Sequence, residues 1–276
     1  MRLRSGAANF QRPRKVIRKL NFMPRVVTTV AEWRSLRATH RAAGRSIGFV
    51  PTMGALHAGH ASLFQMARRD NAVVLASLFV NPTQFDQEND FEHYPRTWGR
   101  DEELMDAAGV DVVFAPQVDE MYPNGTRYAV TENEVSNELE GAHRPGHFTG
   151  MLTVVLKLLQ IAGAERAYFG EKDWQQLQLV RGLAKAFFIP TEIIACPTVR
   201  ETDGLAMSSR NARLSPAERA LAPKFNAALV GAATPAAART QLEATGFAVD
   251  YVEDREGRRL GAVRLRQTRL IDNVAR

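Results

Sequence analysis

The segment Pro51–His60, with the sequence PTMGALHAGH, places two imidazoles three residues apart. An apolar run, Ile47–Val50, precedes it and a helix-like pattern begins near Gly59, so His57 and His60 fall at a turn between a strand and a helix. The start of a helix offers free N–H groups and the positive end of the helix dipole, which favour anions. Imidazoles can donate hydrogen bonds to phosphoryl oxygens. The segment therefore predicts a turn that holds phosphate.

Other uses of the two histidines are less well supported. A single histidine in a turn usually has a structural role, but here two stand among small residues that let a ligand approach the backbone: Gly54, Ala55, Ala58 and Gly59. A metal site lacks a third ligand at suitable spacing nearby. Neither a P-loop nor a Gly-x-Gly-x-x-Gly pattern occurs, so a nucleotide would be bound through the histidine turn.

A second polar segment, Gly170–Asp173, also follows an apolar run and opens a helix-like pattern. In open α/β sheets, ligands bind outside the carboxyl ends of the strands, where this segment would lie. Lys172 would supply a mobile positive charge for phosphate. Asp173 has two open interpretations, since it could accept from ribose hydroxyls or cap the helix predicted over 173–186.

Met207–Arg210 combines two hydroxyls and a guanidinium in a predicted loop. Such a set suits a clamp over a polyphosphate, although an ordinary polar loop between domains is an equal alternative. Gln84 and Gln176 carry neutral hydrogen-bonding groups. A binding role for them is supported only by their nearness to these segments.

The elements that must position these residues alternate between strand and helix. Apolar runs predict strands over 47–50, 72–80, 111–114, 166–169 and 191–195, and helical spacing predicts helices over 30–43, 59–69, 98–108, 148–162 and 173–186. This alternation predicts an α/β fold, a Rossmann-like parallel sheet with helices on both faces. The segment from Tyr128 to His147 is less regular.

A smaller second domain is expected after a boundary near 198–214. Ser215–Glu218 has the Ser, Pro and Glu of a helix start. An Ala-rich helix, a short strand over Ala248–Val252 and a polar end follow.

The net charge of +6 is concentrated at the N-terminus. Residues 1–25 carry eight of the 36 basic residues and no acid, so the rest of the chain has 28 basic and 30 acidic residues. A transit peptide or a disordered arm that binds nucleic acid would fit this pattern. We favour a third interpretation, in which Met23 is the true first residue, and we do not expect nucleic acid as a partner.

The single cysteine, Cys196, excludes an internal disulfide and fits a reducing compartment. It is expected to pack rather than to react. No uninterrupted apolar stretch approaches the roughly 18–20 residues that a membrane-spanning helix needs. We therefore expect a cytoplasmic protein without a membrane partner.

Six blocks in order resemble the pantoate–β-alanine ligase (pantothenate synthetase) family: Pro51–His60, Asn81–Phe85, Tyr94–Arg96, Glu140–Phe148, Phe169–Asp173 with Gln175 and Gln176, and Met207–Asn211. The resemblance runs from about Val26 to Ser215 and resumes at Arg269–Asn273. The His-x-Gly-His element alone is shared across the nucleotidylyltransferase superfamily and says little about the substrate. The ordered set is far more specific.

The resemblance implies a two-step reaction. The carboxylate of pantoate attacks the α-phosphorus of ATP to give pantoyl adenylate and pyrophosphate, and the amine of β-alanine then displaces AMP. Mg²⁺ would accompany ATP, with no protein ligand assigned and no organic prosthetic group. His57, His60 and Lys172 would be catalytic. His60 occupies the position usually assigned as proton donor, but we expect it mainly to stabilise charge at the α-phosphate.

The resemblance also implies the binding residues. ATP would contact Met53, Gly54, Ala55, Leu56, His57, Ala58, Gly59, His60, Gly170, Glu171, Lys172, Asp173, Val199, Met207, Ser208, Ser209 and Arg210. Gln84 and Gln176 would hold pantoate, Gln84 would border the path of β-alanine, and the acidic loop 86–92 would lie near the entrance.

The implied organisation is a basic, disordered extension over 1–25, a Rossmann-like domain over 26–198, a loop over 199–214 and a small α+β lid over 215–276. The lid looks short for the family between Tyr251 and Arg269, which raises the alternative of a homologue that folds without catalysing. A homodimer is implied. A nucleotidylyltransferase with another acceptor is a further alternative, which Gln84, Gln176 and the loop at Tyr94–Arg96 disfavour.

Overall fold

The computed structural model describes residues 23–85, 91–92 and 94–276. The expectations for residues 1–22 and for most of the acidic loop 86–92 therefore lie outside the described residues. Arg25, which the sequence analysis assigns to the N-terminal extension, is the first residue of the first strand.

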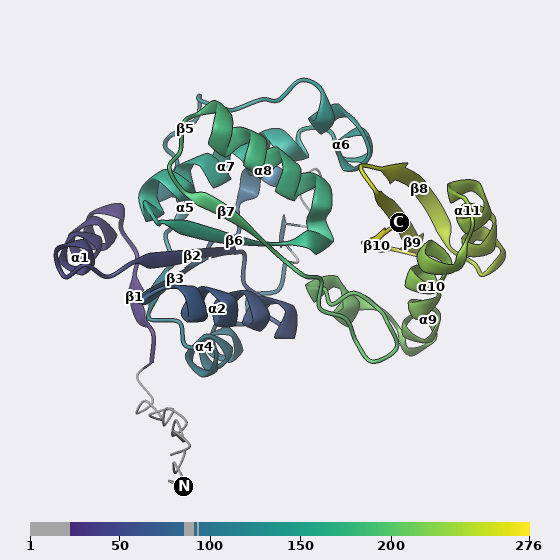
Figure 1. Cartoon of the computed structure of the whole chain (residues 1–276), viewed down its shortest axis with the longest axis horizontal. Coiled ribbons are helices and arrows are strands. Elements are labelled where there is room, and N and C mark those ends of the chain that lie inside the picture. Colours follow the sequence, from purple (N-terminus) through teal and green to yellow (C-terminus); the bar gives the residue numbers. More distant parts are fainter. Residues whose placement is uncertain (1–22, 86–90, 93) are drawn as a thin grey trace, which may run out of the picture.

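Two units make up the described part of the chain (Figure 1). The main unit contains β1 (Arg25–Val27), α1 (Val30–Ala42), β2 (Ile47–Thr52), α2 (Ala58–Asp70), β3 (Val73–Leu78), α4 (Trp98–Ala107), β4 (Val112–Phe114), α5 (Val118–Met121), β5 (Pro123–Thr126), α6 (Glu140–His143), α7 (His147–Ala162), β6 (Arg166–Gly170), α8 (Trp174–Ala186) and β7 (Glu192–Cys196). The C-terminal unit contains α9 (Pro216–Leu221), α10 (Pro223–Gly231), α11 (Pro235–Ala244), β8 (Ala248–Arg255), β9 (Arg258–Leu265) and β10 (Thr268–Ala275).

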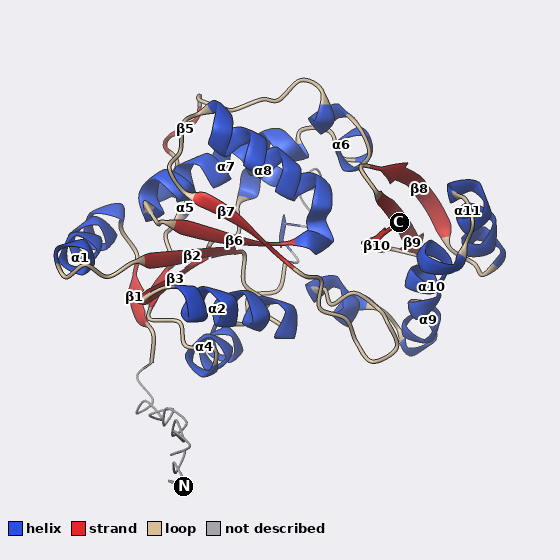
Figure 2. Cartoon of the chain, in the orientation of Figure 1, coloured by secondary structure: helices blue, strands red, loops and turns tan. Residues whose placement is uncertain are grey.

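The main sheet is parallel and has the strand order β1-β4-β3-β2-β6-β7. Neighbouring residues on each strand point to opposite faces, and both faces are covered by helices (Figure 2). The predicted α/β fold is therefore confirmed.

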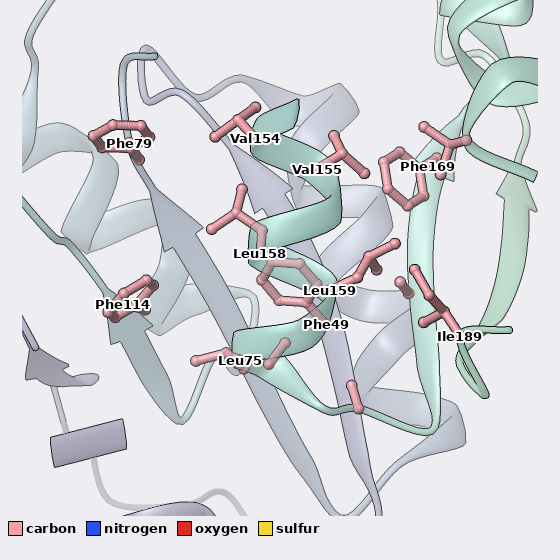
Figure 3. Packing of buried hydrophobic residues seen from close by; sticks show 14 of the residues in the cluster. Phe49, Leu75, Phe79, Phe114, Val154, Val155, Leu158, Leu159, Phe169 and Ile189 are labelled. Atoms are coloured by element: carbon pink, nitrogen blue, oxygen red, sulfur yellow. The ribbon is translucent and has the colours of Figure 1, made fainter. Parts of the chain in front are cut away.

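One core lies under α7 and α8, where Phe49, Leu75 and Phe114 from three strands meet helix residues such as Leu158 and Leu159 (Figure 3). A second core lies on the opposite face under α2 and α4. Burial on both faces explains why the strands read as nearly continuous apolar runs.

The chain order reverses between β2 and β6, which are neighbours in the sheet. On one side of this point the chain runs from β2 through β3 to β4, and on the other from β6 to β7. Ligands of open parallel sheets bind at such a switch point, outside the carboxyl ends of the strands. The histidine turn follows β2 and the Lys172 segment follows β6, so the topology brings the two predicted segments together.

The sequence predicted one short strand over Ala248–Val252 followed by a polar end. This prediction is wrong, because residues 248–275 form a three-stranded antiparallel sheet. Glu256 and Gly257 both adopt positive φ, 48° and 71°, and so connect β8 to β9 through a two-residue turn that matches the strand twist. Arginines at partly buried positions, Arg258, Arg264 and Arg269, hid the strands in the sequence. Arg259 is an exception, since it is fully buried and bonds Asp254 and the carbonyl of Ala232.

None of the helices in the described ranges is long and apolar enough to cross a membrane.

Gly150 of α7 packs against the loop that carries Gln84, and we expect Gly150→Ala to be destabilising. A Cβ there would lie 2.1 Å from the carbonyl oxygen of Thr83, so the loop or the helix must move, at a cost of about 1–3 kcal/mol. Gly182→Ala in α8 is the control, because a Cβ there meets no atom within 4 Å and should stabilise the helix by about 0.5–1 kcal/mol. Urea unfolding measures both, and equal effects would contradict the close packing at Gly150.

Candidate active site

A cavity of about 250 Å³ lies at the switch point of the main sheet. The predicted site residues that line it are Met53, His57, Gly59, His60, Gln84, Gly170, Lys172, Asp173, Gln176, Val199, Met207, Ser208, Ser209 and Arg210. A wider cavity of about 470 Å³ adjoins it between the two units and shares Lys172, Asp173, Gln176, Ser208 and Arg210.

Five predicted site residues do not line the smaller cavity: Gly54, Ala55, Leu56, Ala58 and Glu171. Leu56 is buried in the core beside α2, whereas Ala58 is exposed. The carboxylate of Glu171 faces the C-terminal unit, where it pairs with Arg258 at 2.8 Å.

The rings of the two histidines accept hydrogen bonds from backbone N–H groups at the start of α2. His57 Nδ1 accepts from Gly59 N at 3.1 Å, and His60 Nδ1 accepts from His57 N at 3.3 Å, which makes a reciprocal capping box. Because both Nδ1 atoms accept, both rings are neutral and carry their proton on Nε2. Each imidazole therefore has one N–H left to donate from the far side of the ring.

The sequence predicted free backbone N–H groups at this turn, but most of these groups already have acceptors within the protein. Ala55 N and Leu56 N donate to Asp101, at 2.9 and 2.8 Å, and His60 N and Ala61 N both donate to the carbonyl of His57. With the two bonds to imidazole, six N–H groups are engaged inside the protein. Anion binding at the turn is thereby left to side chains.

Burial lowers the pKa of both histidines. The pKa of His57 falls to about 4, because burial disfavours the imidazolium and Lys172 repels it. The pKa of His60 falls to about 3, through burial and then through repulsion from His57 and Lys172. Both rings are therefore neutral at pH 7, in agreement with their bonds to backbone N–H groups.

Lys172 enters the cavity from a 3₁₀ turn, Glu171–Asp173, between β6 and α8. Its ammonium lies 3.7 Å from the carboxylate of Asp173. Asp173 occupies the position before α8 but makes no side-chain capping bond there, and it lines the cavity. The C-terminal unit supports this turn, since Asn273 Nδ2 donates to the carbonyls of Glu171 and Lys172 at 2.8 and 2.9 Å.

Gln84 is held by Asn81, whose importance the sequence analysis missed. Asn81 is buried and its Nδ2 donates to Gln84 Oε1 at 3.0 Å, while its Oδ1 accepts from the hydroxyls of Tyr122 and Thr83. His147 Nδ1 donates to the carbonyl of Gln84 at 2.8 Å. In the sequence, the signal that could have identified this role was an asparagine directly after a predicted buried strand.

Met207–Arg210 closes the cavity from the connection between the units. Met207 N donates to the carbonyl of Val199 at 3.0 Å, and Ser208 caps the 3₁₀ turn Ser209–Arg213 through Arg210 N. The side chain of Ser209 bonds that of Tyr94, which is buried in the wall of the same cavity. The two predicted loops thus meet at the site.

The C-terminal unit is fixed to the main unit by buried polar contacts. Glu140 is buried and accepts from Arg269 and from the hydroxyl of Tyr251. Arg200, in the connection between the units, binds Asp272 through two bonds of 2.7 and 2.9 Å. Arg269 and Asp272 belong to the block Arg269–Asn273, so this block joins the units.

Acid should destabilise the substrate-free protein through the two histidines. Their folded pKa values lie below the ordinary 6.5, so their stabilising contribution is complete above pH 6.5 and is lost as the pH falls toward 4. Between pH 6.5 and 5 we expect the free energy of unfolding to fall by about 1 kcal/mol per pH unit for each histidine.

The matched control is the double variant His57→Asn, His60→Gln, which keeps acceptors for the two backbone N–H groups but does not titrate. Urea unfolding across this pH range should give it a flatter dependence than the wild type. Equal slopes would contradict the assignment.

Comparisons with known proteins agree with one another. The family model described as pantoate-beta-alanine ligase matches residues 25–275. The chain is 50% identical over 252 residues to a pantothenate synthetase of Bdellovibrio bacteriovorus, covering 91% of this chain and 99% of the relative. It is 51% identical over 228 residues to that of Legionella pneumophila, covering 83% and 90%.

Solved structures give the same result. The pantoate-beta-alanine ligase of Francisella tularensis, crystallised with beta-gamma ATP and beta-alanine, aligns with a TM-score of 0.87 at 41% identity, over 91% of this chain and 97% of that one. The pantothenate synthetase of Thermus thermophilus aligns with a TM-score of 0.82 at 43% identity, over 91% and 99%. The chain therefore belongs to the pantoate–beta-alanine ligase family.

Proposed function

We propose that the cavity at the switch point joins pantoate to β-alanine through a pantoyl adenylate. Members of the family form pantothenate with ATP. The observation that carries the proposal is that two neutral imidazoles, Lys172 and two glutamines converge on one cavity.

In the first step an oxygen of the pantoate carboxylate attacks the α-phosphorus of ATP, and the bond to the pyrophosphate oxygen breaks. Negative charge on the phosphoryl oxygens is then stabilised by the Nε2–H groups of His57 and His60 and by the ammonium of Lys172. Because His60 is neutral at pH 7, it acts as a fixed hydrogen-bond donor rather than as a strong acid. The step needs positioning more than proton transfer.

In the second step the free amine of β-alanine attacks the acyl carbonyl of the adenylate, and AMP leaves. Gln84 would border the path of this amine. The amide bond of pantothenate forms as the acyl–phosphate bond breaks.

Pantoate has two hydroxyls, a carboxylate and a pair of methyl groups on one carbon. Gln84 and Gln176 supply neutral amides for the hydroxyls, and Met151, Val154 and Val155 of α7 supply an apolar wall for the methyl groups. This combination favours pantoate over the acceptors of other nucleotidylyltransferases.

For ATP, the ribose would lie at Gly170–Asp173, the adenine edge at Val199 and the phosphates at the histidines, Lys172 and Met207–Arg210. The described residues contain no cluster of three or more His, Cys, Asp or Glu side chains that could hold a metal ion. Mg²⁺ would therefore arrive with ATP, held mainly by phosphate oxygens, and would neutralise their charge.

The C-terminal unit would act as the lid over ATP, with its boundary in the connection 199–214. The wider cavity between the units supports this role. We also propose a homodimer in the cytoplasm. The free, buried thiol of Cys196 is consistent with that compartment, and size-exclusion chromatography tests the dimer.

The direct test is AMP formation with each substrate omitted in turn. AMP should appear only when ATP, pantoate and β-alanine are all present, and pyrophosphate should be released when β-alanine alone is missing. A chromatographic assay of AMP measures this. AMP formation with neither pantoate nor β-alanine, or only with other acids, would refute the proposal.

His60 can be tested separately from its role as a cap. His60→Gln keeps a side-chain acceptor for His57 N but removes the imidazole N–H, whereas His60→Ala removes both. We expect both variants to lower kcat by about 100-fold or more, since a donor to a developing charge is lost. Only His60→Ala should also lose about 1 kcal/mol of stability. A stable His60→Gln enzyme with the wild-type rate would disprove the assignment.

A further inference from the structure

The turn between β2 and α2 has an unusual backbone that forms an anion-binding hollow. Gly54 and Ala55 are consecutive residues with positive φ, 86° and 51°, and this conformation is strained at Ala55 because that residue carries a Cβ. The N–H groups of Ala55 and Leu56 point to one acceptor residue. Successive N–H groups arranged in this way form a concave site for an anion.

The anion in this hollow belongs to the protein. Asp101 of α4 places Oδ2 2.9 Å from Ala55 N and Oδ1 2.8 Å from Leu56 N. The hydroxyl of Thr97 donates to Oδ1 at 3.0 Å, and Asp101 is only 1% exposed. A Cβ on Gly54 would lie 3.2 Å from Oδ2, so the carboxylate fits closely against a glycine.

The histidines follow this fixed point directly. Leu56 is anchored both by its N–H bond to Asp101 and by burial of its side chain, and His57 is the next residue. The capping box fixes the rings relative to α2, but it does not fix the turn relative to the cavity. The bonds from α4 supply that second constraint.

We propose that Asp101 is a positioning residue of the active site. It fills the hollow that a phosphate group would otherwise occupy, and it sets the direction in which His57 and His60 present Nε2–H to the nucleotide. This inference rests on the proposed function of the histidine turn.

The test compares Asp101→Asn with Asp111→Asn. An asparagine at 101 can accept from one backbone N–H but presents an NH₂ group to the other. We expect kcat for AMP formation to fall about 10- to 100-fold, since small misplacements of catalytic groups have effects of this size. Asp111 also accepts from a backbone N–H, that of Val74 at 2.8 Å, but at the opposite end of the strands, so Asp111→Asn should lower stability and leave kcat unchanged.

A spectroscopic readout separates positioning from general stability. Nitrogen-15 NMR of labelled histidines should show the Nε2–H tautomer for His57 and His60 in the wild type, with signals identified from His57→Asn and His60→Gln. These two signals should shift or broaden in folded Asp101→Asn and stay unchanged in Asp111→Asn. This readout needs no turnover, so an enzyme that forms no AMP would refute the proposed function while the positioning role is still measured.

Thr97→Val provides a second variant if Asp101→Asn does not fold. It keeps the carboxylate but removes one of its donors, and should shift the same signals with a smaller loss of kcat, about two- to fivefold. Wild-type kcat and unchanged His57 and His60 signals in folded Asp101→Asn, or in Thr97→Val if that is the variant that folds, would overturn the proposal.

Discussion

The bonds that the rings of His57 and His60 accept from the backbone constrain the chemistry at the switch point more than any other contact there. Each ring uses Nδ1 to accept from a backbone N–H and so keeps Nε2–H for a ligand. Burial reinforces this state by holding both pKa values low. The two imidazoles therefore act as fixed N–H donors, although two histidines in a motif first suggest groups that titrate. The positive charge comes instead from Lys172 and Arg210, which line the same cavity.

The C-terminal unit supports the turn that carries Lys172. Asn273 bonds the carbonyls of two residues in the turn that aims Lys172, and Arg258 pairs with Glu171 in that turn. The guanidinium of Arg258 also stacks over Trp174 at the start of α8, 4.0 Å from the ring centre. The turn that carries Lys172 is thus held from both units.

Periodicity and motif order were enough to predict the parallel sheet, because its strands are buried on both faces and its helices have clear ends. They failed for β9 and β10, where arginines interrupt the apolar pattern although none of them is exposed in the fold. Many residues of the site could be predicted because they follow the ends of strands. The hydrogen bonds that hold them could not be predicted from the sequence. Asp101 looks like an ordinary acid in the first turn of a helix, and its two backbone partners lie 45 and 46 residues away. Two of the engaged N–H groups of the histidine turn, those of Ala55 and Leu56, depend on that same distant carboxylate.

The bond between Asn273 and the carbonyl of Lys172 spans 101 positions of the chain. During synthesis the ribosome must add all of these residues before the lysine turn gains this partner. All residues that line the cavity precede the C-terminal unit in the chain, but the lysine turn is fully supported only when the last strand is in place. A chain interrupted within the C-terminal unit would therefore lack the support of its lysine turn, and long-range closure of this kind is a slow step in folding.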